Sequence, residues 1–108
     1  MKLVTVIHAA FEKTPVVVAK VKIHSHLDGQ VACEYAYRWT NNVLGSWSRK
    51  EKEINGYENG DFNEDVEVIK PIKFRAMGLR STSMGDYMLF DGKKYEVDMA
   101  GFKEIANG

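Results

Sequence analysis

A β-hairpin predicted near the C-terminus constrains the fold of this chain more than any other feature of its sequence. Two short segments with aromatic and aliphatic residues, 87–90 and 93–98, are separated by Asp91-Gly92. An Asp-Gly pair between two strands is typical of a type I′ turn, which sets the register of the strands. This register brings four apolar side chains to one face of the hairpin, namely Met88, Phe90, Tyr95 and Val97. A last short strand is predicted over residues 101–105.

Two more strands are predicted at the N-terminus. Residues 3–8 are apolar and β-branched, and residues 16–24 alternate apolar and polar side chains. The apolar set expected to share one face of the second strand is Val17, Ala19, Val21 and Ile23. Between the strands, Pro15 lacks a backbone donor and restricts Thr14 to extended conformations. The segment before residue 16 is therefore predicted to be a loop, such as the connection of a hairpin.

The segment 28–42 is predicted to be a helix that begins at the N-cap Asp28. Apolar residues recur along it every four positions and are accompanied by small ones, giving the set Val31, Ala32, Tyr35, Ala36 and Trp39. We expect Tyr35 and Trp39 to lie against the sheet. Truncation of Trp39 to alanine is then expected to cost about 3 to 5 kcal/mol of stability.

These elements together predict one domain, 1–108, of the α+β class. We expect a mainly antiparallel sheet of about four or five strands with one helix (about 28–42) packed on one face. The composition supports a folded domain, because 44% of the 108 residues are hydrophobic and 28% are charged. Residues 49–65 are rich in asparagine, glycine and charge and are predicted to form a solvated loop.

Cysteine usage and hydropathy favour the cytoplasm as the location of this protein. The single cysteine, Cys33, fits a reducing compartment and is expected on the helix as a small packing residue. The apolar run 3–7 is shorter than the core of a signal peptide. No apolar stretch approaches the ~20 residues that cross a bilayer. We therefore expect neither secretion nor a membrane partner.

Bulk charge excludes a strongly basic nucleic-acid binder and a highly acidic DNA mimic, since 15 basic residues balance 15 acidic ones. The charge is nevertheless uneven along the chain. Residues 51–67 hold seven acids and one lysine. Residues 70–80 hold no acid and four basic residues, which are Lys70, Lys73, Arg75 and Arg80. Two patches of opposite charge are predicted, provided that these segments do not fold over each other.

Few side chains are spaced for catalysis or metal binding. His24 and His26 lie two positions apart, so on a strand both imidazoles would point to one side. His8 could join them only if the first two strands pair. No cysteine or glutamate at ligand spacing accompanies these histidines, and we favour two polar residues at a strand end. No nucleotide-cofactor motif is found. We predict no catalytic residue, no metal site and no cofactor.

The segment 80–86 clusters a guanidinium, three hydroxyls and a glycine. A turn of this composition can present backbone donors to a phosphate or a carboxylate. The alternative is local turn chemistry, because serine and threonine side chains also satisfy the backbone of their own turns and Gly85-Asp86 leads directly into the hairpin. Local turn chemistry is the interpretation that we favour.

Two stretches of the chain resemble bacteriophage proteins. The text EYAYRWTNNVLGSWS and, after a variable acidic stretch, LRSTSMGDYMLFDGKKYEVDMAGFKEI resemble small uncharacterised proteins of tailed bacteriophages. The second stretch is also similar to the YodL-like domain of phage and mobile-element proteins. The features shared with that domain are Arg80 to Asp86, Tyr95, Val97, Gly101 and Phe102. The resemblance covers about residues 31–48 and 79–105, implies a phage or mobile-element origin, and brings no catalytic residue with it.

The expected function is that of a phage-encoded accessory protein that docks on a host protein, such as a defence protein, in the host cytoplasm and modulates or inhibits it. Exposed aromatic residues beside charged loops are effective interface material, so residues 47–67 are expected to carry the contact. Trp47 is either an exposed anchor or, as we favour, a packed cover over the helix end. The basic segment with its serine turn is the alternative surface. The residues expected to contact the partner are Trp47, Tyr57, Phe62, Lys73, Arg75, Arg80, Ser81 and Ser83.

Two other functions are compatible with the sequence. A nucleic-acid-binding accessory protein would use the basic Lys70–Arg80 segment and would bind more weakly as the salt concentration rises. A small metal-dependent hydrolase would use His8, His24 and His26. Stoichiometric zinc or manganese in the purified protein, lost on mutation of His24 and His26, would identify the hydrolase.

Overall fold

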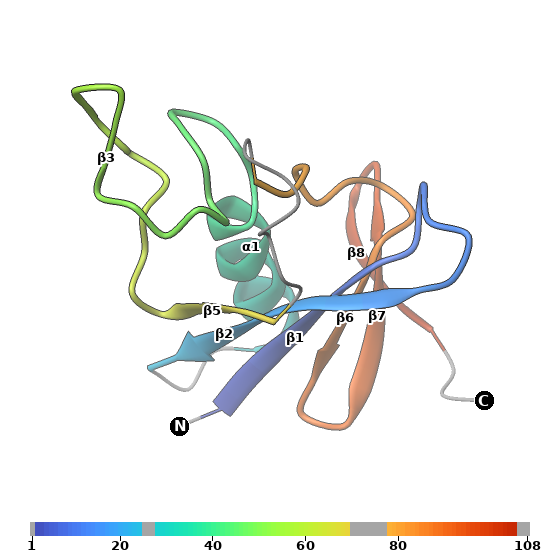
Figure 1. Cartoon of the computed structure of the whole chain (residues 1–108). Helices are drawn as coiled ribbons and strands as arrows, with labels where there is room; N and C mark the ends of the chain where they lie inside the picture. The colour runs from blue at the N-terminus through green and yellow to red at the C-terminus, as the bar shows by residue number, and fades with distance from the viewer. Residues whose placement is uncertain (1, 25–27, 70–77, 106–108) are drawn as a thin grey trace.

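A six-stranded antiparallel sheet and one helix make up most of the structure, a computed structural model that describes residues 2–24, 28–69 and 78–105 (Figure 1). The strands lie in the order β5-β2-β1-β6-β7-β8 across the sheet. Their bounds are Lys2–His8 for β1, Val16–Ile23 for β2, Val66–Val68 for β5, Tyr87–Phe90 for β6, Lys93–Asp98 for β7 and Gly101–Ile105 for β8. The helix α1 spans Gly29–Trp39, and a separate ribbon pairs β3 (Glu53–Ile54) with β4 (Tyr57–Glu58).

The β6–β7 hairpin has the predicted register. Phe90 pairs with Lys93 across the turn. Asp91 and Gly92 have positive φ angles of 53° and 76°, as a type I′ turn requires. The four side chains of the predicted inner face are at most 5% exposed, and they are Met88, Phe90, Tyr95 and Val97. β8 pairs with β7, which confirms the last short strand.

A β-bulge in β2 changes which side chains of that strand are buried. β1 and β2 form the predicted hairpin, but the register shifts between Val6, which pairs with Ala19, and Ile7, which pairs with Val17. Val18 is the extra residue, so Val18 and Ala19 are both buried whereas Val17 is 39% exposed. The prediction that Val17 faces the core is wrong, because strict alternation assumes an unbroken ladder.

α1 is shorter than the predicted helix. The Asp28 side chain caps it as predicted, by accepting a hydrogen bond from the Val31 N–H at 3.0 Å. At the other end, Thr40 Oγ1 donates to the carbonyl of Ala36 at 2.8 Å, and the Thr40 backbone is no longer helical. The helix therefore ends at Trp39, earlier than predicted.

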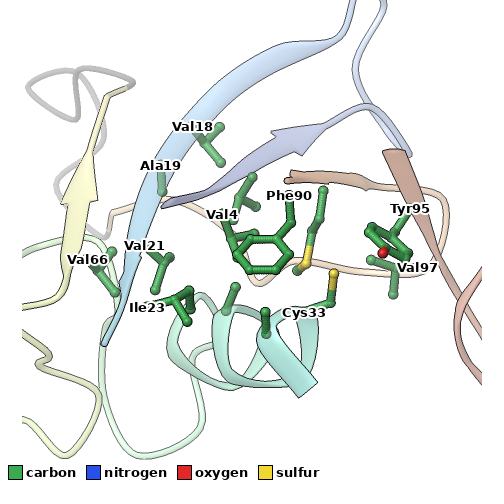
Figure 2. Packing of buried hydrophobic residues seen from close by; sticks show 14 of the residues in the cluster. Val4, Val18, Ala19, Val21, Ile23, Cys33, Val66, Phe90, Tyr95 and Val97 are labelled. Atoms are coloured by element: carbon green, nitrogen blue, oxygen red, sulfur yellow. The ribbon is translucent and has the colours of Figure 1, made fainter. Parts of the chain in front are cut away.

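The face of α1 that meets the sheet consists of small side chains. Figure 2 shows sheet residues pointing toward the helix, among them Val4, Val21 and Phe90. The fully buried helix residues are Ala32, Cys33 and Ala36. Val31 is 41% exposed, and Tyr35 and Trp39 are only partly buried. The four-residue apolar repeat thus lies on the flank of the helix, because close packing against a sheet favours small residues at the point of nearest approach.

The α+β class, with one helix on one face of a mainly antiparallel sheet, is confirmed, but the sheet has six strands rather than four or five. The missed strand is β5, which pairs with β2 through Val66 opposite Val21. β5 has three residues and directly follows the predicted solvated loop 49–65. A strand this short has too few positions for alternation to be recognised in the sequence.

Residues 41–65, which we call the lobe, contain more internal structure than the predicted solvated loop. Asp61 is fully buried, and its carboxylate accepts hydrogen bonds from the N–H groups of Val43 and Leu44 at 2.8 Å each. Arg38 of α1 donates to the same carboxylate at 3.1 Å. Asp61, which lies within the predicted solvated loop, thus joins the lobe to the helix, because its carboxylate pairs with Arg38 and satisfies backbone N–H groups near the helix end.

Trp47, rather than Trp39, is the fully buried tryptophan of the core. It is 0% exposed, and its ring meets that of His8 edge to face at 6.3 Å between ring centres. Its Nε1–H donates to the carbonyl of Arg80 at 2.9 Å. The apolar periodicity of the helix pointed to Trp39, whereas Trp47 lies in an irregular segment where no periodicity exists.

We predict that Trp47→Ala lowers the free energy of unfolding by about 3 to 5 kcal/mol, because it leaves a large cavity and an unpaired carbonyl. Trp39→Ala, the matched control at the partly buried tryptophan, is expected to cost less. Urea unfolding followed by circular dichroism measures both values. Equal losses in the two variants would contradict the position of Trp47 at the core.

Candidate functional site

The serine-rich turn before β6 is organised around one buried carboxylate. The Asp86 side chain has no exposed surface and accepts hydrogen bonds from the N–H groups of Ala9 at 2.8 Å, Ala10 at 2.9 Å and Ser83 at 2.8 Å. The guanidinium of Arg80 donates two more, each at 2.8 Å. Asp86 therefore joins the loop after β1 to the turn before β6.

Arg80 is held by acids on two sides. Besides Asp86, its guanidinium contacts both carboxylate oxygens of Glu12, at 3.1 and 2.7 Å. The Phe11 ring centre lies 5.0 Å from the guanidinium carbon. The hydrogen bonds to Asp86, above all, raise the pKa of Arg80 further. A guanidinium engaged by two carboxylates has little capacity left for a phosphate or for an acid of a partner.

The pKa of Asp86 reflects the same contacts. Burial by itself would raise it, but the hydrogen bonds from Arg80 and from the amides of Ala10, Ala9 and Ser83 outweigh burial and lower the pKa to about 2. The carboxylate is therefore ionised throughout the neutral pH range. In the structure these groups serve the turn and the adjoining loop.

Buried hydroxyls connect this turn to α1. Thr82 Oγ1 donates to Thr40 Oγ1 at 2.8 Å, and Thr40 Oγ1 donates in turn to the carbonyl of Ala36. His8 Nε2 lies 3.0 Å from Thr82 Oγ1 and donates to it, because the threonine proton is already directed at Thr40. Burial, followed by the charge of Arg80, lowers the pKa of His8, so its imidazole is neutral and packs as a core side chain.

The histidines do not converge on one site within the described residues. β1 and β2 pair, but His8 lies opposite Val16 at one end of the hairpin, while His24 follows β2 at the other end. His24 Nε2 contacts Asp65 Oδ1 at 2.6 Å. His26 lies outside the described residues. Among residues 2–24, 28–69 and 78–105, no group of three or more potential ligands is placed to hold a metal ion.

The aromatic residues expected to anchor a partner differ in exposure. Trp47 is fully buried, which confirms the favoured interpretation that it packs as a cover and contradicts its place among the expected partner contacts. Phe62 is partly buried, with the ammonium groups of Lys50 and Lys52 at 4.8 and 5.8 Å from its ring centre. Tyr57 is 78% exposed on β4. Tyr57 is thus the aromatic residue of this set that is free to meet a partner.

The polar residues expected at the partner surface have internal roles where the structure describes them. Ser81 Oγ accepts a hydrogen bond from the N–H of Asn42 at 2.8 Å. Ser83 directs its N–H to the buried carboxylate of the turn. Lys73 and Arg75 lie outside the described residues. The hydrogen bond between Asn42 and Ser81 therefore connects the lobe to the serine turn.

The sheet face opposite α1 is left uncovered by the described helices and strands, and we call it the open face (Figure 1). Side chains alternate along a strand, so residues between buried positions point away from the helix. On β2, β1 and β6 these include Leu3, Thr5, Ile7, Val17, Tyr87 and Leu89. Leu3, Val17 and Leu89 are 44%, 39% and 37% exposed. Lys20 and Lys22 of β2 share this face, opposite Thr5 and Leu3, so its apolar centre lies on β1 and β6 and extends to Val17 of β2.

The strand register makes these residues contiguous. Ile7 pairs with Val17 on one side and with Tyr87 on the other. Thr5 pairs with Leu89 in the adjacent row. Because cross-strand neighbours lie about 5 Å apart, the side chains form one patch rather than scattered exposed groups. The bulge in β2 contributes to this patch, since it turns Val17 outward.

Charged residues on the outer strands border the apolar patch. Lys20 of β2 lies opposite Glu67 of β5, and Glu96 lies opposite Lys103, whereas the exposed Lys22 of β2 adds a further positive charge beside Leu3. The ammonium of Lys94 lies 4.4 Å from the ring centre of a tyrosine on β6. A patch with an apolar centre and charges of both signs at its border has the anatomy of a protein interface.

Sequence reasoning missed the open face, although the sequence contains a signal for it. Residues 3–7 include no charged side chain at any position, whereas a strand with one solvated face alternates apolar and charged residues. The same holds for residues 87–90. Two such strands that pair at the centre of a sheet indicate that both faces of the sheet can meet apolar surroundings.

We predict that the Arg80–Asp86 pair makes stability fall in acid. The pKa of Asp86 is lowered from 3.8 to about 2 on folding, so its contribution is fully present above the unfolded value and is lost as the pH falls toward 2. The shift corresponds to about 2 kcal/mol. The difference in free energy of unfolding between wild type and Asp86→Asn should shrink as the pH is lowered from about 5 to 2. A constant difference in urea titrations would contradict this role.

Comparisons with known proteins were made for the whole chain. No family model, no curated protein and no solved structure matches it. In the part of the chain that the structure describes, no helix is long and apolar enough to cross a membrane.

Proposed function

We propose that this protein acts by binding another protein, as an accessory protein of a phage or mobile element that docks on a host protein, such as a defence protein, and modulates or inhibits it. The open face is the observation that supports binding. Its centre on β1 and β6 is apolar, and its border carries charges of both signs. Covering Leu3, Val17 and Leu89 with a partner would remove apolar surface from water, which is the main favourable contribution to most protein association.

The state of the buried polar groups supports binding rather than catalysis. Asp86, His8 and Thr82 are all engaged in hydrogen bonds that hold loops together. Within the described residues, every buried side-chain nitrogen and oxygen has a hydrogen-bond partner. Burial raises the pKa of Cys33 to about 12, so its thiol is protonated and is a poor nucleophile at neutral pH. In the structure these groups hold the fold together, which supports the proposal of a binding protein.

The phage origin and the host cytoplasm are part of the same proposal. The origin is supported by the resemblance of residues 31–48 and 79–105 to phage and mobile-element proteins, and the cytoplasm by the single cysteine. The nucleic-acid alternative relied on four basic residues of the segment 70–80. Arg80, one of the four, is engaged by Glu12 and Asp86, which weakens that alternative.

Capture from lysates of candidate bacterial hosts tests the proposed function. Leu3→Glu with Leu89→Glu places two charges on the open face, and Leu44→Glu with Tyr57→Glu is the matched pair on the lobe, at side chains that are 67% and 78% exposed. We predict that the open-face variant loses a captured host protein by tenfold or more, since a truncated or charged hot spot costs about 2 kcal/mol or more. The lobe variant should retain it.

Circular dichroism must show that both variants are folded. Loss in the lobe variant alone would move the contact to the lobe, which overlaps the region 47–67 expected from the sequence. Equal capture by wild type and both variants would show that neither surface binds the partner. If neither wild type nor either variant captures a protein from any of the hosts in which the chain is expressed, protein binding as its function is contradicted.

A further inference from the structure

The outer edge of β8 ends the six-stranded sheet and carries an unusual side-chain contact. Gln30, in the first turn of α1, donates from Nε2 to the carbonyl of Phe102 at 2.5 Å and accepts from the Phe102 N–H through Oε1 at 3.3 Å. A carboxamide that bonds both the N–H and the C=O of Phe102 makes the two contacts that the N–H and C=O of one residue of an antiparallel neighbouring strand would make. The edge therefore already accepts a peptide-like group at this position.

The antiparallel ladder shows which other backbone groups point outward. Val97, opposite Phe102, exchanges hydrogen bonds with the segment just before β6 instead. Phe102 and Val97 are therefore a non-hydrogen-bonded pair of the β7–β8 ladder. The same follows for Glu104 and Tyr95, because bonded and non-bonded pairs alternate along an antiparallel ladder. The N–H and C=O of Glu104 thus point out of the sheet edge, where none of the described residues pairs with them.

We propose that the edge of β8 is a strand-addition site for an extended segment of a partner protein, and that the Gln30 carboxamide occupies the position of one residue of that segment until binding displaces it. Main-chain hydrogen bonds at Phe102 and Glu104 provide the attachment, and neighbouring side chains select the segment. This proposal rests on the proposed function only in assuming that the ligand is a protein. It does not depend on the open face.

Two shallow cavities beside the start of β8 give room for side chains of the incoming segment. One of about 280 Å³ is bordered by Gln30 and Lys103, and one of about 410 Å³ is bordered by Met84 and Met99. The cavities share Phe102 in their walls. Met84 and Met99 are 55% and 87% exposed. Methionine side chains adapt to different apolar groups, which suits a rim that receives a partner residue.

A second copy of this chain fits the edge poorly. The antiparallel register that lets Phe102 of one copy bond Glu104 of the other places Lys103 opposite Lys103, and a register centred on Glu104 places two acids opposite each other. Like charges directly opposite are destabilising. The register centred on Phe102 leaves Glu104 opposite a residue outside β8. A segment with an acid opposite Lys103 and a base opposite Glu104 is complementary instead.

The probe that follows from this complementarity is the peptide acetyl-Val-Lys-Glu-Val-Thr-amide, which would run antiparallel to β8. Its analogue with N-methyl groups on the lysine and on the second valine is the matched control, because those two amides would bond Glu104 and Phe102. We expect the peptide, but not the analogue, to shift the backbone amide signals of Phe102 and Glu104 in an NMR titration of the whole chain. Gln30→Ala should tighten binding about 2- to 10-fold, since the two hydrogen bonds by which Gln30 competes for Phe102 are removed.

Other variants keep the test decisive. Glu104→Pro removes an outward N–H at an exposed edge position and should abolish peptide binding with an unchanged circular dichroism spectrum. Equal binding of the methylated analogue, or unchanged binding to Gln30→Ala, would overturn the proposal. Dimerisation of Gln30→Ala in sedimentation would also overturn it, by assigning the edge to a second copy. The variant Leu3→Glu with Leu89→Glu should bind the peptide normally, which separates this site from the open face.

Discussion

The position of the loops beside β1 and β6 depends on the hydrogen bonds and the ion pair that the Asp86 carboxylate makes. This carboxylate satisfies backbone N–H groups of two segments that lie far apart in the chain, and it holds Arg80, whose carbonyl accepts the indole N–H of Trp47. The loop after β1, the turn before β6 and the segment after α1 are therefore positioned around a single buried charge. The charge is tolerated there because five donors replace the water that it loses on folding.

Much of the fold could be predicted from the sequence because its signals are local. The Asp91-Gly92 turn and the Asp28 cap each depend on residues adjacent in the chain, and both are present in the structure. The features that escaped prediction arise from contacts between distant segments. The bulge at Val18 is visible only once β1 is paired with β2, and the burial of Trp47 depends on β1 and on the turn before β6.

The candidate surfaces were less predictable than the fold. Tyr57 is exposed as the sequence suggested, but the open face is assembled from strands that are separated by most of the chain. Gln30 is a polar residue without any motif around it, and its contact with Phe102 becomes visible only when β8 is placed beside the start of α1. Surfaces of this kind depend on the register of the strands, which decides which side chains are neighbours and cannot be deduced from any single residue.

Cys33 lies between α1 and the sheet with no exposed surface (Figure 2). A thiol reagent in solution can reach it only when the helix and the sheet separate, and burial keeps the thiol protonated until then. The rate at which such a reagent labels the native chain therefore measures how often this interface opens. Because the chain has one cysteine, each labelled molecule reports one such opening. Thiol labelling therefore measures the internal motion of this protein without a probe being introduced.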